Sequence, residues 1–255
     1  MRTLITFSCE GETLVATLDD APGTTGLLIV SGGNEIRSGA HRGMAMLAHR
    51  LAETGIPVFR YDRRGVGDST GDNGGYLTAK ADLVAAAAAF RSAAPHVTRL
   101  IGFGNCDAAS TLAVFGHAAG IERIVAANPW VIEPIDDLPP ASAIRARYWR
   151  ALRDPAAWKR ALTGNLNIGN LFKGLQRVAN ARQEVDNAVA KRVLAALAEW
   201  QDDAAIILAG GDATAIAFAA AAGTAFPAET IDTASHSFTG AAGAALEAAI
   251  RRNLA

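Results

Sequence analysis

Cysteine is scarce in this sequence, and its scarcity excludes a fold held together by disulfides. Only Cys9 and Cys106 are present among 255 residues, whereas small secreted domains that depend on disulfides carry several pairs. Two cysteines and five scattered histidines also offer no spacing typical of a metal site. We therefore expect a reduced, cytoplasmic protein that holds no metal and no cofactor.

Long apolar runs and an excess of one charge are missing as well. No apolar stretch reaches about 18 residues, so we expect no membrane span, and the N-terminal residues lack the apolar core of a signal peptide. The formal net charge is -1, which argues against nucleic acid as a partner because its binding surfaces need a basic excess. Half of the residues (50%) are hydrophobic, enough for one sizeable core.

Short apolar runs alternate with helical patterns along most of the chain. Residues 2–9 and 13–18 predict an antiparallel hairpin around Glu10-Gly11. The later strands that we expect cover residues 27–30, 57–62, 100–103, 124–127, 205–209 and 228–233. The helices that we expect cover residues 40–54, 78–93, 107–118, 213–222 and 240–253. Such alternation predicts an α/β fold with a mostly parallel sheet and helices on both faces, and ligands then bind beyond the carboxyl ends of the strands.

The alternation stops between Pro129 and Asp203, where no strand pattern occurs. This stretch contains all four tryptophans and predicts helices over residues 141–153, 155–163, 170–180 and 184–200. Because it follows the carboxyl end of a strand, we expect residues 133–202 to form a helical lid over the site. Residues 1–132 and 203–255 would form the core. A helical decoration that contacts no ligand is the alternative.

The sharpest local motif is the strand-to-helix turn at residues 104–108. A nucleophile on such a strained turn needs small residues two positions before and after it, and Gly104 and Ala108 meet this need. Cys106 would be the nucleophile, and the N-terminus of the following helix favours its thiolate form. Taken alone, the motif fits equally well a buried cysteine at the start of a helix.

Two further residues follow the ends of later strands. His236 comes after the last strand and is the candidate base, while Asp212 comes after the strand before it and would fix the tautomer of His236. Asp212 equally suits the N-cap of the helix that begins at residue 213. The rival acids are Asp136, Asp137 and Asp232. The chain order Cys, Asp, His is the order of an α/β hydrolase.

An oxyanion would be stabilised by backbone N–H groups. We expect one donor at Asp107, next to the nucleophile, and a second in the loop after the first parallel strand, at Gly33 or Asn34. An ordinary glycine turn is the alternative for this loop. The basic residues at the same edge are Arg37, His41 and Arg42. We interpret them as a site for an anionic group of the substrate, with exposure to solvent as the alternative.

The stretch DRRGVGDS at residues 62–69 is similar to the D-x-R-G-x-G-x-S stretch of many α/β hydrolases. It lacks the G-x-G-x-x-G of a dinucleotide loop, so we interpret it as a structural turn with internal hydrogen bonds. Together with the glycines at 32–33 and the three candidate catalytic residues, the resemblance covers nearly the whole chain and implies the α/β-hydrolase fold with a helical lid.

A narrower resemblance rests on residues 37–42 and 105–110. They look like the corresponding segments of the exosortase A system-associated hydrolases of the first type, a bacterial family linked to exopolysaccharide production and protein sorting. Asn34-Glu35 departs from the Pro-Gln of that family, and the turn at Cys106 departs from G-x-S-x-G by its cysteine and by Ala108.

These observations predict an acyl hydrolase or acyltransferase that acts on an ester, thioester or lactone. Cys106 would attack the carbonyl carbon, His236 would shuttle the proton and Asp212 would hold His236. The expected partner is a small-molecule acyl substrate, and a homodimer is left open. The alternative is a binding protein that keeps the fold with an inactive site, since fold alone does not prove activity.

Overall fold

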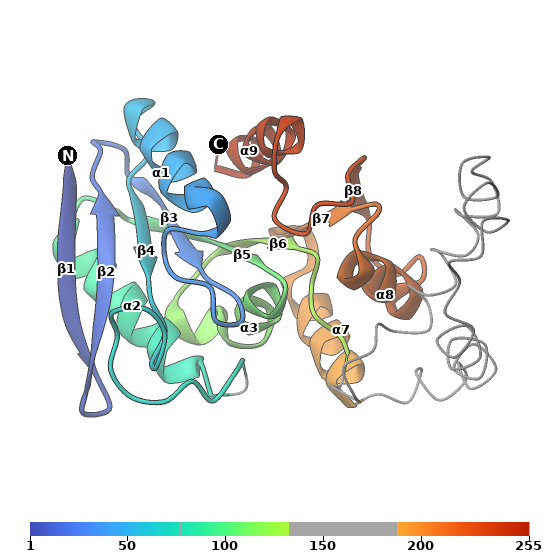
Figure 1. The fold of residues 1–255 in the computed structure, drawn as a ribbon, viewed down its shortest axis with the longest axis horizontal. Coiled ribbons are helices and arrows are strands. Elements are labelled where there is room, and N and C mark those ends of the chain that lie inside the picture. Colours follow the sequence, from blue (N-terminus) through green and yellow to red (C-terminus); the bar gives the residue numbers. More distant parts are fainter. Residues whose placement is uncertain (77, 133–187, 255) are drawn as a thin grey trace, which may run out of the picture.

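The computed structural model describes residues 1–76, 78–132 and 188–254. Its centre is an eight-stranded sheet with the strand order β1-β2-β4-β3-β5-β6-β7-β8 (Figure 1). The strands are β1 (Arg2–Cys9), β2 (Glu12–Asp19), β3 (Thr25–Val30), β4 (Val58–Tyr61), β5 (Arg99–Asn105), β6 (Arg123–Ala127), β7 (Ala204–Ala209) and β8 (Ala228–Ile231). β2 runs antiparallel to β1 and to β4, whereas the pairs from β4 to β8 are all parallel.

The hairpin of β1 and β2 closes through a two-residue turn. Glu10 and Gly11 both have positive φ angles, 50° and 89°, and Cys9 pairs with Glu12 directly across the turn. Positive φ at both central positions matches the twist of the flanking strands, which is why glycine suits the second position. The hairpin expected from the sequence is confirmed.

Helices cover both faces of the sheet. The α-helices are α1 (Gly43–Glu53), α2 (Lys80–Ala93), α3 (Asp107–Phe115), α7 (Ala188–Trp200), α8 (Ala213–Ala222) and α9 (Ala241–Leu254). The short 3-10 helices are η1 (Ala40–Arg42), η2 (His117–Ala119) and η4 (Gln201–Asp203). α1 and α9 lie on one face, and the other α-helices lie on the opposite face (Figure 1). Because the strands β3 to β8 are parallel, their carboxyl ends all lie along the same side of the sheet.

The apolar run of β3 follows from its burial on both faces. Leu27 and Ile29 pack in the core under α1 and α9, whereas Leu28 and Val30 pack in the core under α2 and α3. Successive side chains of a strand point to opposite faces, so a strand covered on both sides has no polar positions. The parallel, doubly covered sheet expected from this pattern is confirmed.

α7 lies within the range that the sequence assigned to the lid. Val193, Leu197 and Trp200 are buried in the core on the α3 side, and the Trp200 Nε1–H donates to the carbonyl oxygen of Ala113 at 2.8 Å. Residues 188–200 are therefore a core helix, and the expected lid boundary at residue 202 falls inside the core. The rest of the expected lid, residues 133–187 with Asp136 and Asp137, lies outside the described residues.

None of the described helices combines the length and the apolar character needed to cross a bilayer.

Candidate active site

Cys106 lies on a strained turn between β5 and α3. Its φ and ψ angles are 64° and −127°, a conformation that residues other than glycine rarely adopt and that concentrates at functional sites. A Cβ atom at Gly104 would come within 2.7 Å of the carbonyl carbon of Ala108, so only glycine fits there. The thiol remains partly exposed. The sharp turn that the motif predicts is present.

His236 links Asp212 to Cys106. Its Nδ1 atom lies 3.1 Å from Asp212 Oδ2, and the Cys106 side chain is close enough to contribute to the raised pKa of the ring. The three residues come from the turns that follow β5, β7 and β8. Segments more than a hundred residues apart are thus brought together at the carboxyl edge of the sheet.

Asp212 also caps α8. Its Oδ2 atom accepts hydrogen bonds from the backbone N–H groups of Thr214 and Ala215, at 3.0 and 3.1 Å. The two interpretations of this residue, N-cap and partner of a histidine, are therefore compatible. The rival Asp232 is exposed and forms no ion pair with any part of the chain that the structure describes.

Contacts within this trio shift the pKa of two groups. The hydrogen bond with Asp212, followed by that with Cys106, raises the pKa of His236 to about 10, although burial opposes the shift. Burial alone would raise the pKa of Asp212, but the hydrogen bond and charge of His236 and the two cap amides outweigh it and lower that pKa. The raised pKa favours the protonated form of His236.

A network of side-chain amides fixes the loop that carries His236, which we call the histidine loop. This network was not predicted from the sequence. The buried Asn128 donates through Nδ2 to Asn105 Oδ1 at 2.9 Å and to the carbonyl oxygen of His236 at 3.3 Å. Its Oδ1 accepts the backbone N–H of Ala209 at 2.8 Å, and Asn105 Nδ2 donates to the same His236 carbonyl oxygen at 2.9 Å. Asn128 follows the end of β6, and that position is the only signal in the sequence.

One of the two N–H groups expected as oxyanion donors in the loop after β3 already has an acceptor. The N–H of Gly33 donates to Asp107 Oδ1 at 2.6 Å, so this group is occupied. The backbone N–H groups of Asn34 and Asp107 have no acceptor within residues 1–76, 78–132 and 188–254. These two are the donors that the geometry leaves available.

The three basic residues at this edge have different surroundings. Arg37 forms ion pairs with Asp62 and, through Nη2, with Asp68 at 2.8 Å, so its guanidinium is used within the turn at residues 62–69. His41 and Arg42 are exposed and have positive φ angles of 51° and 60°. His41 lines a groove of about 410 Å³ between α1 and α9, together with Ser237 and Phe238, so it does lie beside the histidine loop.

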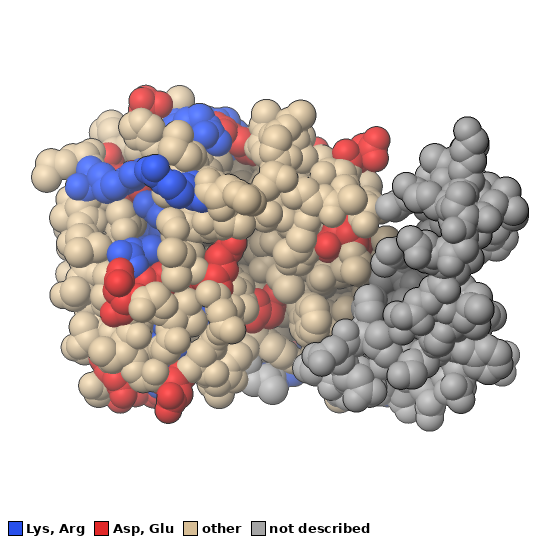
Figure 2. Space-filling view, viewed as in Figure 1, with Lys and Arg blue, Asp and Glu red and all other residues tan. Residues whose placement is uncertain are grey.

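The face shown in Figure 2 carries basic and acidic side chains close to one another and no broad field of one sign. Among the described residues, Arg2 and Arg60 both form ion pairs with Asp19, at 2.6 and 3.0 Å. The turn at residues 62–69 is held internally as expected, since Ser69 Oγ donates to the Asp62 carbonyl oxygen at 2.8 Å.

Solved structures resemble this chain, whereas sequence comparison finds no match. The chain matches no protein-family model and no curated protein. An α/β serine hydrolase without a lid from Xanthomonas campestris matches 99% of this chain and 93% of its own, with a TM-score of 0.59 and 15% identity. An esterase from Pyrococcus furiosus matches with a TM-score of 0.61 and 14% identity, over 100% of this chain and 91% of its own.

This chain has the α/β-hydrolase fold. A thioesterase domain from the curacin biosynthetic pathway shares it, with a TM-score of 0.60 and 13% identity over 98% of this chain and 99% of that one. Identities this low show the fold alone. What the α/β-hydrolase fold does here has to be argued from Cys106 and the residues around it.

Proposed function

We propose that this protein is an acyl hydrolase or acyltransferase that works through a covalent acyl-cysteine at Cys106. One observation carries the proposal: an imidazole that pairs with a carboxylate also interacts with a thiol on a strained turn, and that interaction contributes to its raised pKa. His236 acts on the proton, and Asp212 fixes its tautomer and stabilises its positive charge.

The reaction proceeds in two halves. The Cys106 thiolate attacks the carbonyl carbon, and the electron pair of the C=O double bond moves to oxygen, where the N–H groups of Asp107 and Asn34 donate to it. The intermediate collapses, and the leaving alkoxide or thiolate takes a proton from His236. Water or an acceptor alcohol then gives a proton to His236 and attacks the acyl-cysteine, which releases the product acid or ester and the thiolate.

Esters, thioesters and lactones are the substrate classes that fit this chemistry. An acyl-cysteine is itself a thioester, so a thioester substrate exchanges its acyl group at little thermodynamic cost. The names of two structural neighbours, an esterase and a thioesterase domain, support the same classes.

The narrower resemblance at residues 37–42 and 105–110 leads us to propose a role beside bacterial exopolysaccharide and exosortase systems. Deletion of the gene in its host should then alter exopolysaccharide yield or the sorting of exported proteins. Unchanged yield and sorting would contradict this role.

A cytoplasmic location and a homodimer are further proposals. Cell fractionation tests the location, and light scattering tests the oligomeric state.

Turnover tests the proposed activity directly. We expect the wild-type protein to release p-nitrophenol from short-chain esters, or thiol from acyl-CoA thioesters, and we expect Cys106→Ala to lower kcat at least about 1,000-fold. Cys9→Ala serves as the matched control, because Cys9 is buried on β1 away from the trio, and it should retain turnover. Turnover that persists in Cys106→Ala would refute the proposal, and no turnover on any substrate would favour the binding-protein alternative.

A further inference from the structure

The side chain of Asp107 forms a hydrogen bond with the loop after β3 that carries Gly33 and Asn34, which we call the oxyanion loop. Its Oδ1 atom accepts the N–H of Gly33 at 2.6 Å, and its Oδ2 atom lies 3.3 and 3.2 Å from Nη1 and Nη2 of Arg63. Arg63 Nη2 also donates to the carbonyl oxygen of Gly33. Asp107 and Arg63 carry opposite charges and contact each other. Asp107 therefore binds the N–H of Gly33, while Arg63 binds its C=O.

Burial and charge make this arrangement rigid. The Arg63 side chain is only 2% exposed and that of Asp107 is 16% exposed, so breaking the pair would leave a buried charge without a partner. The first turn of α3 additionally favours a carboxylate at Asp107. A Cβ atom at Gly32 would lie 2.6 Å from Asp107 Oδ1, so the loop approaches the carboxylate as closely as a glycine permits.

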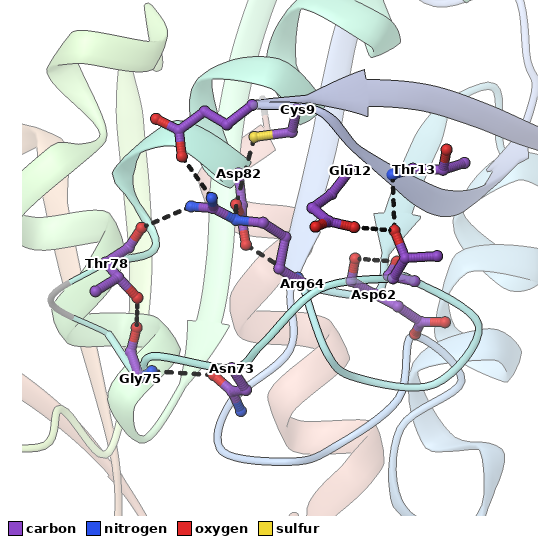
Figure 3. A network of polar contacts seen from close by, with 12 residues as sticks. Cys9, Glu12, Thr13, Asp62, Arg64, Asn73, Gly75, Thr78 and Asp82 are labelled. Atoms are coloured by element: carbon purple, nitrogen blue, oxygen red, sulfur yellow. Dashed lines mark hydrogen bonds and ion pairs between the residues drawn. The ribbon is translucent and has the colours of Figure 1, made fainter.

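The segment that carries Arg63 is itself anchored on its other side. The next residue, Arg64, forms an ion pair through Nε with the buried Asp82 at 2.5 Å and donates to the Thr78 carbonyl oxygen at 3.3 Å, which Figure 3 shows. From the same segment, Asn73 accepts from the N–H of Gly75 (Figure 3). Its Nδ2 donates to Gly33 O at 3.1 Å and to Asn34 Oδ1 at 2.9 Å. Two neighbouring arginines, Arg63 and Arg64, thus connect the loop that carries Gly33 to the start of α2.

We propose that Asp107 and Arg63 are positioning residues that clamp Gly33, so that the backbone N–H of Asn34 serves as the second oxyanion donor. This inference rests on the proposed function, since it assumes that an oxyanion forms beside Cys106. The contrary possibility is that Asp107 blocks the Gly33 N–H and must leave before a substrate binds. The two possibilities predict opposite effects when the carboxylate is removed.

Two reactions of the Cys106 sulfur distinguish a loss of oxyanion stabilisation from a general disruption of the fold. Acylation by p-nitrophenyl acetate forms an oxyanion, whereas alkylation by iodoacetamide displaces iodide and forms none. We expect Asp107→Ala to slow acylation about 10- to 100-fold without slowing alkylation of Cys106. Asp107→Asn keeps an oxygen that accepts the Gly33 N–H, so its loss should be smaller, and it serves in place of the alanine variant if that variant fails to fold.

The matched control is Asp203→Asn. Asp203 forms an ion pair with Arg123 at 3.0 Å at the opposite edge of the sheet, before β7, so neither rate should change. Acylation that becomes faster in Asp107→Ala, or acylation and alkylation that fall together, would overturn the clamp.

Hydrogen exchange at Gly33 tests the clamp independently of turnover. The Gly33 amide should exchange faster in Asp107→Ala than in the wild-type protein, while amides in the central strand β5 keep their protection. Unchanged exchange at Gly33 overturns the clamp whatever the activity. Absence of any acylation in the wild-type protein overturns the proposed function instead, and the exchange result then decides on the clamp.

Discussion

The two cysteines show how environment sets the chemistry of one side chain. Cys9 is buried, and burial followed by the charge of Asp82 raises the pKa of its thiol to about 11. Cys106 is partly exposed, lies at the N-terminus of α3 and contributes to the raised pKa of His236. A thiol that keeps its proton is a poor nucleophile, so Cys9 is not placed for reaction.

Labelling by iodoacetamide at pH 7 should therefore distinguish them. We expect Cys106 to be alkylated well before Cys9 in the folded protein, and His236→Ala to slow the reaction at Cys106 because the thiolate loses its charged partner. Peptide mass spectrometry over a time course measures both sites. Equal and slow labelling of the two cysteines would show that Cys106 is not activated.

At the scale of elements, the ends of four strands are tied together by amides. Asn105 ends β5, Asn128 follows β6, and both donate to the carbonyl oxygen of His236 after β8. Asn128 Oδ1 also accepts from Ala209, at the end of β7. The histidine is thus positioned through its own backbone as well as through Asp212.

Replacement of Asn128 by aspartate should disrupt this tie. The acceptor for Ala209 is kept, but a carboxylate oxygen replaces the donor and faces two carbonyl oxygens. We expect the free energy of unfolding to fall by about 1–3 kcal/mol and kcat to fall more than KM rises, because His236 loses its orientation. Urea unfolding and steady-state kinetics measure the two effects.

Asn253→Ala is the control for that substitution. Asn253 also uses both ends of its amide, with Arg123 and the Ala249 carbonyl oxygen as partners at 3.1 and 2.9 Å, but it lies near the end of α9. Its loss should cost stability without changing kcat. An Asn128→Asp variant with unaltered kcat would contradict the role of the network.

The elements themselves were predictable from sequence, and the contacts between loops were not. Apolar runs such as residues 27–30 and the glycines that end helices carry local signals, so each expected strand agrees with the structure within a few residues. The ion pair of Arg37 with Asp62 was not foreseen, because nothing in the sequence places the two residues side by side. The same holds for the carboxylate of Asp107, whose contact with Gly33 spans 74 positions.

At the scale of the whole molecule, the site and the stability of the fold depend on the same charges. Asp212 and His236 stand on separate turns, so their ion pair at 3.1 Å exists only when the sheet is assembled. Groups whose pKa differs between the folded and unfolded states make stability depend on pH. The direction of each shift gives the sign.

The raised pKa of His236 favours the protonated, folded form. Its contribution to stability is fully present below about pH 6.5 and is lost as the pH rises towards about 10. The Asp212 contribution also stabilises the folded state but has the opposite pH dependence: it is lost in acid, as the pH falls through the lowered pKa of Asp212. We expect Tm to decline between pH 6.5 and about 10 more steeply in the wild-type protein than in His236→Gln. The effect is moderated by solvent, because the His236 side chain is 44% exposed.

His49→Gln is the matched control, since His49 is an exposed histidine paired with Glu53 on α1. Scanning calorimetry across this pH range compares the three proteins. Parallel Tm curves for the wild-type protein and His236→Gln would mean that the imidazolium pair does not stabilise the folded state.

The most direct test of the account is to trap the acyl-enzyme. The wild-type protein is mixed with p-nitrophenyl acetate, quenched in acid within the first turnover and digested for peptide mass spectrometry. We predict one acetyl group on Cys106, released by hydroxylamine as a thioester should be, and none at that position in Cys106→Ala. Release of p-nitrophenol with Cys106 unmodified, or an acetyl group attached to another residue, would contradict the central claim.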